Sequence, residues 1–154
     1  MKLFQIEEPD GSPLDAGDGP GAAVGIDIAA GGIGRVAVSL GGNAEILPGA
    51  DGERSLVAAI GHDAVAVTKD LLLGLRSRAE KQLAQPVTHA VIAVEANARA
   101  GIEDAAAAAG LVVLRVVERA VAAALVKGTA PAEAAVLGAA IAAEDAAAAL
   151  APRP

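Results

Sequence analysis

The chain has 154 residues and a formal net charge of −7; 54% of its residues are hydrophobic, yet only 1% are aromatic. This length suits one domain, whose single core must be built from Ala, Val, Leu and Ile. The acidic charge argues against a nucleic-acid partner, the lack of Cys excludes disulfides, and no apolar run approaches the roughly 20 residues of a membrane span, so we expect a soluble, cytoplasmic protein.

The N-terminal residues 1–21 are rich in Gly, Pro and Asp and lack a hydrophobic period, which predicts a flexible leader. From Ala22 onward, "AAVGIDIA", "RVAVSL" and "AEILP" have strand patterns and are separated by glycine-rich turns. These three segments predict an antiparallel meander. Asp27 lies toward the exit end of its first, most buried strand, and three glycines follow it: Gly31, Gly32 and Gly34.

The second half alternates helices and strands. Leu72, Leu75, Ala79 and Leu83 recur at helical spacing, and "THAVIAVE" and "LVVLRVV" predict two buried strands. Between and after them, "RAGIEDAAAAAG", "ERAVAAALVKG" and a long segment from Pro131 predict three more helices, the second ending at Gly128. The predicted fold is therefore α/β, with a mixed five-stranded sheet of three antiparallel and two parallel strands and helices on its faces. It forms one domain over residues 22–150, followed by a tail at 151–154.

Four blocks of the chain, in order, resemble the ATPase domain of the Hsp70 (DnaK-type) family. They are "VGIDIA", "AEKQLAQPVTHAVIAV", "GLVVLRVVERAVAAALVKG" and "PAEAAVLGAA". The resemblance implies an actin-like, ribonuclease H-like fold. An Hsp70 would place its second lobe between Gly128 and Pro131, a smaller insertion between Ala50 and Val65, and a peptide-binding domain after the ATPase domain. This sequence has none of these three parts. It therefore resembles a truncated, divergent member that retains only the first subdomain.

The resemblance also implies a site around Asp27, which matches the family's acid in a magnesium shell beside nucleotide phosphates. Gly31, Gly32 and Gly34 would let main-chain N–H groups approach a phosphate. Glu95 departs from the family, which has Pro at this place; if the first and fourth strands are parallel neighbours, Asp27 and Glu95 project from adjacent exit ends and would share a divalent cation. Simpler interpretations remain open: Asp27 as a relic or a strand-end acid bonded to local N–H groups, Glu95 as a solvated loop acid, and the glycines as a hairpin turn.

Other positions depart from the family pattern. Ala29, Ala30 and Gly31 replace the family's Gly-Thr-Thr, which removes the hydroxyls that hold phosphate. Arg119 occupies the place of the family's general catalytic Glu; we expect it to form a local surface charge pair with Glu118. No residue is therefore assigned a catalytic role, and the balance of motifs leans away from an enzyme.

Two functions follow, and a third possibility is a purely regulatory partner of a full-length chaperone. The first is a degenerate, chaperone-related binding or assembly module with weak or no affinity for ATP and Mg²⁺, whose partner is another protein or a second copy of itself. The alternative is a nucleotide sensor or ATPase that completes its cleft by dimerising, with Asp27 and Glu95 around Mg²⁺.

Overall fold

The computed structural model of the protein describes residues 21–58 and 64–150. The predicted leader lies outside these residues except for Gly21, and so does the predicted tail. The elements follow one another as β1 (Ala22–Ala29), β2 (Ile33–Leu40), β3 (Asn43–Ile46), β4 (Leu56–Val57), α1 (Ala64–Leu83), β5 (Val87–Val94), the 3₁₀ helix η1 (Ala96–Ala98), α2 (Ile102–Ala108), β6 (Val112–Glu118), α3 (Arg119–Ala123) and α4 (Pro131–Leu150).

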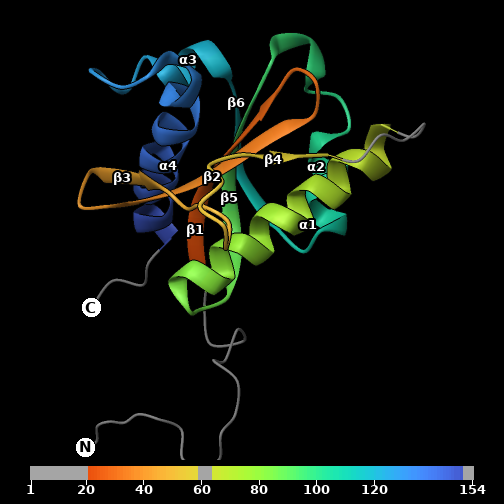
Figure 1. The fold of residues 1–154 in the computed structure, drawn as a ribbon, viewed down its shortest axis with the longest axis horizontal. Helices are drawn as coiled ribbons and strands as arrows, with labels where there is room; N and C mark the ends of the chain where they lie inside the picture. The colour runs from red at the N-terminus through yellow and green to blue at the C-terminus, as the bar shows by residue number, and fades with distance from the viewer. Residues whose placement is uncertain (1–20, 59–63, 151–154) are drawn as a thin grey trace, which may run out of the picture.

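One mixed sheet organises these elements, in the strand order β3-β2-β1-β5-β6. The pairs β1–β2 and β2–β3 are antiparallel, whereas β1–β5 and β5–β6 are parallel. The predicted antiparallel meander, the two parallel strands and the adjacency of the first and fourth predicted strands are confirmed. This is the ribonuclease H-like arrangement, and it brings the exit ends of β1, β5 and β6 to one edge of the sheet (Figure 1).

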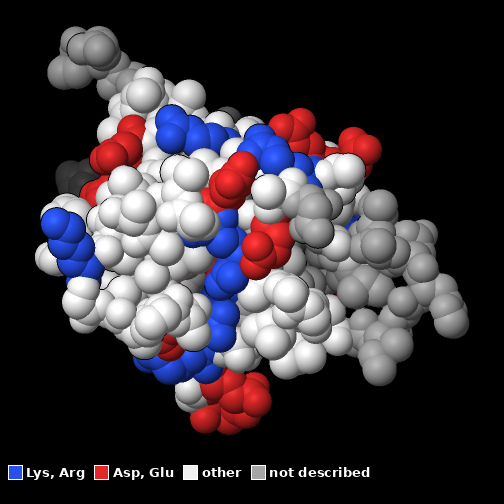
Figure 2. Space-filling model, turned by 90° about the horizontal axis from the view of Figure 1, so that it is seen from above, with Lys and Arg blue, Asp and Glu red and all other residues white. Residues whose placement is uncertain are grey.

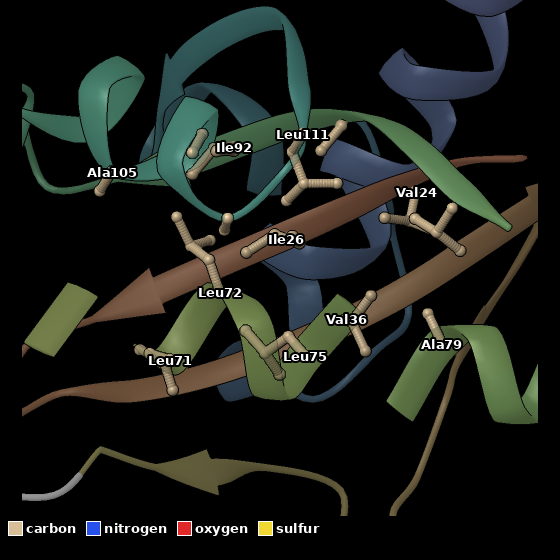
Figure 3. Close-up of a cluster of buried hydrophobic side chains, with 14 of the residues drawn as sticks. Val24, Ile26, Val36, Leu71, Leu72, Leu75, Ala79, Ile92, Ala105 and Leu111 are labelled. Carbon is tan, nitrogen blue, oxygen red and sulfur yellow. The ribbon is translucent and has the colours of Figure 1, made fainter. Parts of the chain in front are cut away.

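Helices cover both faces of the sheet: α1 and α2 lie on one face, α3 and α4 on the other (Figure 1). The larger apolar cluster fills the space between the sheet and the α1/α2 layer. Figure 3 shows its centre, formed by Val24, Ile26, Val36, Leu71, Leu72, Leu75, Ala79, Ile92, Ala105 and Leu111. Leu72, Leu75 and Ala79 are fully buried, which confirms the predicted apolar face of this helix.

The α4 layer packs closely because two glycines lie at its contacts. A Cβ added at Gly25 on β1 would collide with the backbone of Ala139 and Ala140, and one at Gly138 would collide with the carbonyl group of Ala122 in α3. The absence of side chains at these two points lets α4 lie directly on the sheet and on α3. A core almost without aromatic rings is thus compensated by short distances between backbones.

Glu144 ties α4 to the turn between β2 and β3. Its carboxylate accepts hydrogen bonds from the Ser39 hydroxyl at 2.7 Å and from the Gly41 and Gly42 N–H groups at 2.6 and 3.0 Å. These bonds lower the pKa of Glu144, the Ser39 bond most and the two glycine bonds next. The ionised carboxylate therefore fastens the far end of the meander to the helix layer.

Two details differ from the sequence prediction. The sheet has a sixth strand, β4, which pairs with β2 through only two residues. The helix α3 ends at Ala123 instead of Gly128, and residues 124–130 lead directly into α4. Within the described residues no second lobe intervenes at this point. None of the helices in residues 21–58 and 64–150 is long and apolar enough to cross a membrane.

Candidate functional site

Asp27 is the buried charge at the centre of the sheet's exit edge. It lies on β1, in register with Arg35 on β2 and with Ala93 on β5. Its side chain is fully excluded from solvent. A carboxylate that is removed from water needs a cation or several hydrogen-bond donors to remain ionised. The neighbours of Asp27 therefore decide what this site can do.

The principal partner of Asp27 is Arg119, the first residue of α3. Arg119 Nε donates to Asp27 Oδ1 at 2.6 Å, and Nη2 donates to Oδ2 at 3.1 Å, so the guanidinium binds both carboxylate oxygens. Paired N–H···O bonds of this kind are stronger and more directional than a single ionic contact. The hydrogen bond with Asp27 is the main cause of a raised pKa of Arg119, which burial partly opposes.

Glu95 joins the same guanidinium from the end of β5. Arg119 Nη1 donates to Glu95 Oε2 at 3.1 Å. The Glu95 side chain is 47% exposed, so this second contact lies at the solvent boundary of the site. The two acids predicted to share a metal cation are thus brought together, and in the structure the cation between them is an arginine side chain.

The charges continue away from Asp27 on its other side. Arg35 Nη1 lies 3.6 Å from Asp27 Oδ2. The pKa of Glu133 is lowered, mainly by its hydrogen bond with Arg54 and to a smaller extent by the charge of Arg35. Arg54 binds both carboxylate oxygens of Glu133, at 2.6 and 3.0 Å. Seen from above, this end of the molecule carries a band of Lys and Arg atoms with Asp and Glu atoms beside it (Figure 2). The ion pairs named above join three arginines and three acidic side chains.

The three predicted phosphate-binding glycines lie at different depths. Gly31 and Gly32 form the turn between β1 and β2 with positive φ values of 82° and 73°. Gly31 faces open space, whereas the Gly32 carbonyl accepts a hydrogen bond from the Ala58 N–H at 2.7 Å. Gly34 lies against α1, where a Cβ would come within 2.7 Å of Leu75 Cδ1. Only Gly31 and Gly32 belong to the exposed turn; the absence of a Gly34 side chain serves helix packing.

The expected local pair between Arg119 and Glu118 is wrong. Arg119 turns toward the sheet and binds Asp27, which lies 92 residues away in sequence, and Glu95. Sequence reasoning missed this role, although two signals were present. Arg119 follows a predicted strand parallel to those that end near Asp27 and Glu95, and the hairpin register sets Arg35 opposite Asp27. A buried acid at the meeting point of three strand ends needs a cation, and the residues that follow those ends are the nearest source of one.

Across residues 21–58 and 64–150, no three His, Cys, Asp or Glu side chains come together as a metal site would require. The oxygens of Asp27 are occupied by the guanidinium of Arg119, and the neighbouring Arg35 adds a second positive charge. What the arrangement does chemically is pair a buried acidic side chain with an internal cation.

Comparison with known protein families identifies the family to which the chain belongs. The model of the family described as Hsp70 protein matches residues 61–138, about half of the chain. The chain belongs to the Hsp70 family. The match runs from residue 61, shortly before α1, into α4, and so it contains the segment with Glu95 and Arg119 but not the strand that carries Asp27. A comparison with curated proteins finds no match. Membership in the Hsp70 family agrees with the resemblance seen in the second, third and fourth sequence blocks.

Proposed function

We propose that this Hsp70-family protein is a non-hydrolysing binding or assembly module, in which Arg119 has taken the place of the nucleotide-bound magnesium ion. The observation that carries the proposal is the bidentate bond between Arg119 and the fully buried Asp27. With an arginine in place of the family's catalytic Glu, a residue that would orient water has become one that neutralises Asp27. The site is thereby converted from a cation-binding edge into a closed ion pair.

Electrostatics support this proposal. Mg²⁺ needs near-octahedral oxygen ligands at about 2.0–2.1 Å and keeps several of its waters. To reach Asp27 it would have to displace two charge-assisted hydrogen bonds and remain beside Arg119 and Arg35. Two unit charges about 4 Å apart near a protein surface interact by roughly 4 kcal/mol, and here the interaction with each guanidinium is repulsive. Magnesium binding at Asp27 is therefore expected to be weak.

Groups for phosphate chemistry are also few. Ala29 and Ala30 carry no hydroxyl groups, and Gly34 is committed to packing against α1. Phosphoryl transfer depends on several placed charges acting together, so the loss of the hydroxyls, the Glu and the second lobe removes most of the machinery at once. A module of this kind acts through its surface, by holding a protein partner.

Isothermal titration calorimetry with Mg-ATP tests the proposal. We expect no saturable heat at millimolar nucleotide with the wild-type chain, and no phosphate release in a parallel assay. Saturable, magnesium-dependent binding that is lost in Asp27→Asn and weakened in Glu95→Gln would overturn it. Glu95→Gln serves as the second variant because its half-exposed side chain leaves the core intact. Circular dichroism at 222 nm verifies that both variants are folded.

A further inference from the structure

The outer surface of α3 is apolar and uncovered. Ala120, Val121, Ala124 and Leu125 are exposed; Val121 is 58% and Leu125 53% accessible. Ala120 and Val121 lie in α3, and Ala124 and Leu125 form the turn that follows it, in which the Leu125 N–H donates to the Ala122 carbonyl at 3.0 Å. Their spacing is that of one side of a helix. The opposite side carries Ala122, which is buried against Gly138. We call these four exposed residues the α3 face.

The α3 face extends into a region with little charge. Residues 120–132 contain a single charged side chain, Lys127, although charged residues make up 20% of the chain. Ala130, Pro131 and Ala132, which follow Lys127 in the chain, are exposed as well. Contiguous apolar surface rimmed by charges is typical of a protein–protein contact, whereas single exposed apolar residues are not.

The charges at the two ends of the α3 face have opposite signs. Glu118 precedes the helix and Lys127 follows it, and both are exposed. Within the described residues neither side chain takes part in a hydrogen bond or ion pair. A surface that is negative at one end, apolar in the middle and positive at the other end is complementary to itself when a copy is turned by 180°.

We propose that the α3 face is a homodimer contact, in which two copies pack their α3 helices antiparallel about a two-fold axis. Val121 and Leu125 form the apolar centre, and Glu118 of each copy lies next to Lys127 of the other. One helix face with its neighbouring residues is a small interface, so the dimer is a transient one with a dissociation constant in the micromolar range. This inference rests on the proposed function, because it names the partner of the binding module as a second copy of the chain.

Sedimentation velocity over a concentration series tests the contact. The wild-type chain should pass from monomer to dimer, and Leu125→Glu should weaken the dimer by at least tenfold. Leu40→Glu is the matched control. Leu40 is 69% exposed but lies at the end of β2, outside the α3 face, so the dimer of this variant should have the same dissociation constant as the wild-type dimer. A wild-type chain that stays monomeric up to hundreds of micromolar, or equal effects of the two substitutions, would overturn the proposal and indicate a different occupant.

Charge reversal tests the antiparallel arrangement. Glu118→Lys and Lys127→Glu should each weaken the homodimer by up to about tenfold, because each replaces two attractive surface pairs with two repulsive ones. An equimolar mixture of the two variants should associate as strongly as the wild type, since both pairs are then attractive again. Failure of the mixture to recover would overturn the two-fold geometry. The calorimetric titration with Mg-ATP tests the proposed function separately. A chain that stays monomeric and does not bind Mg-ATP contradicts only the dimer, whereas a chain that dimerises and binds Mg-ATP contradicts the proposed function.

Discussion

Arg119 and Asp27 are 92 residues apart in sequence, and the guanidinium of the first binds both carboxylate oxygens of the second, at 2.6 and 3.1 Å. The carboxylate is fully buried, and 23% of the arginine side chain remains accessible. The pair joins the start of α3 to the central strand β1 across the exit edge of the sheet. It is therefore both the counter-charge of a buried acid and a long-range tie within the fold.

Removing the arginine should destabilise the protein strongly. Arg119→Met leaves Asp27 buried with only the more distant Arg35, and we expect the free energy of unfolding to fall by about 3 kcal/mol, as for other broken buried ion pairs. Guanidinium unfolding followed by circular dichroism is the suitable measurement, since the chain has no Trp or Tyr. Arg99→Met, at an exposed arginine, is the control and should change stability by less than about 0.5 kcal/mol. Equal stabilities of the two variants would contradict the assignment.

The helices and strands could be predicted from the sequence more completely than the contacts of the site. The strands and α1 could be predicted because apolar residues recur in each of them at a regular spacing. In α1, for example, Leu72, Leu75 and Ala79 are three and four residues apart, which is the spacing of one helix face. The strand β4 is too short to show any period. The helix α3 was predicted too long because Ala-rich segments have high helix propensity; in the structure it ends at Ala123 and a turn follows.

The contacts of the site join side chains that are far apart in the sequence, and a periodic pattern does not predict such contacts. Asp27 and Glu95 could be placed at one sheet edge from the strand order alone, and the structure brings them together there. That Arg119 binds both is a property of side-chain direction at the first residue of a helix. A local pair with Glu118 is the commoner outcome for neighbouring opposite charges, which is why sequence reasoning chose it.

The close contact between β1 and α4 gives a second prediction. Gly25→Ala should lower the free energy of unfolding by about 3 kcal/mol, because the new Cβ would meet the backbone of α4, which has no flexible side chain to move aside. Gly41→Ala is the matched control: its φ is 63°, but a Cβ there meets nothing within 4 Å, so only the backbone strain of about 1 kcal/mol should appear. Denaturant unfolding of both variants gives the comparison. A smaller loss for Gly25→Ala than for Gly41→Ala would show that α4 lies farther from the sheet.

The Glu144 contacts predict a pH dependence of stability. Its pKa is lowered in the folded state, mainly by the Ser39 hydroxyl and then by the Gly42 and Gly41 N–H groups. The stabilisation is therefore complete above the unfolded-state pKa of about 4.3 and is lost as the pH falls through the lower folded-state pKa. Glu144→Gln should reduce the melting temperature near neutral pH, and its difference from the wild type should shrink in acid. A difference that stays constant from neutral pH down to about pH 3 would contradict the role of the ionised carboxylate.

The central claim is that the charge of Asp27 is satisfied inside the protein by Arg119, and a double-mutant cycle tests it most directly. The four chains are the wild type, Asp27→Asn, Arg119→Met and the double variant, and the free energy of unfolding of each is measured in guanidinium chloride. We expect a coupling energy of about 2–3 kcal/mol, with the double variant more stable than Arg119→Met alone. A coupling energy near zero, with the two single losses simply adding, would contradict the claim.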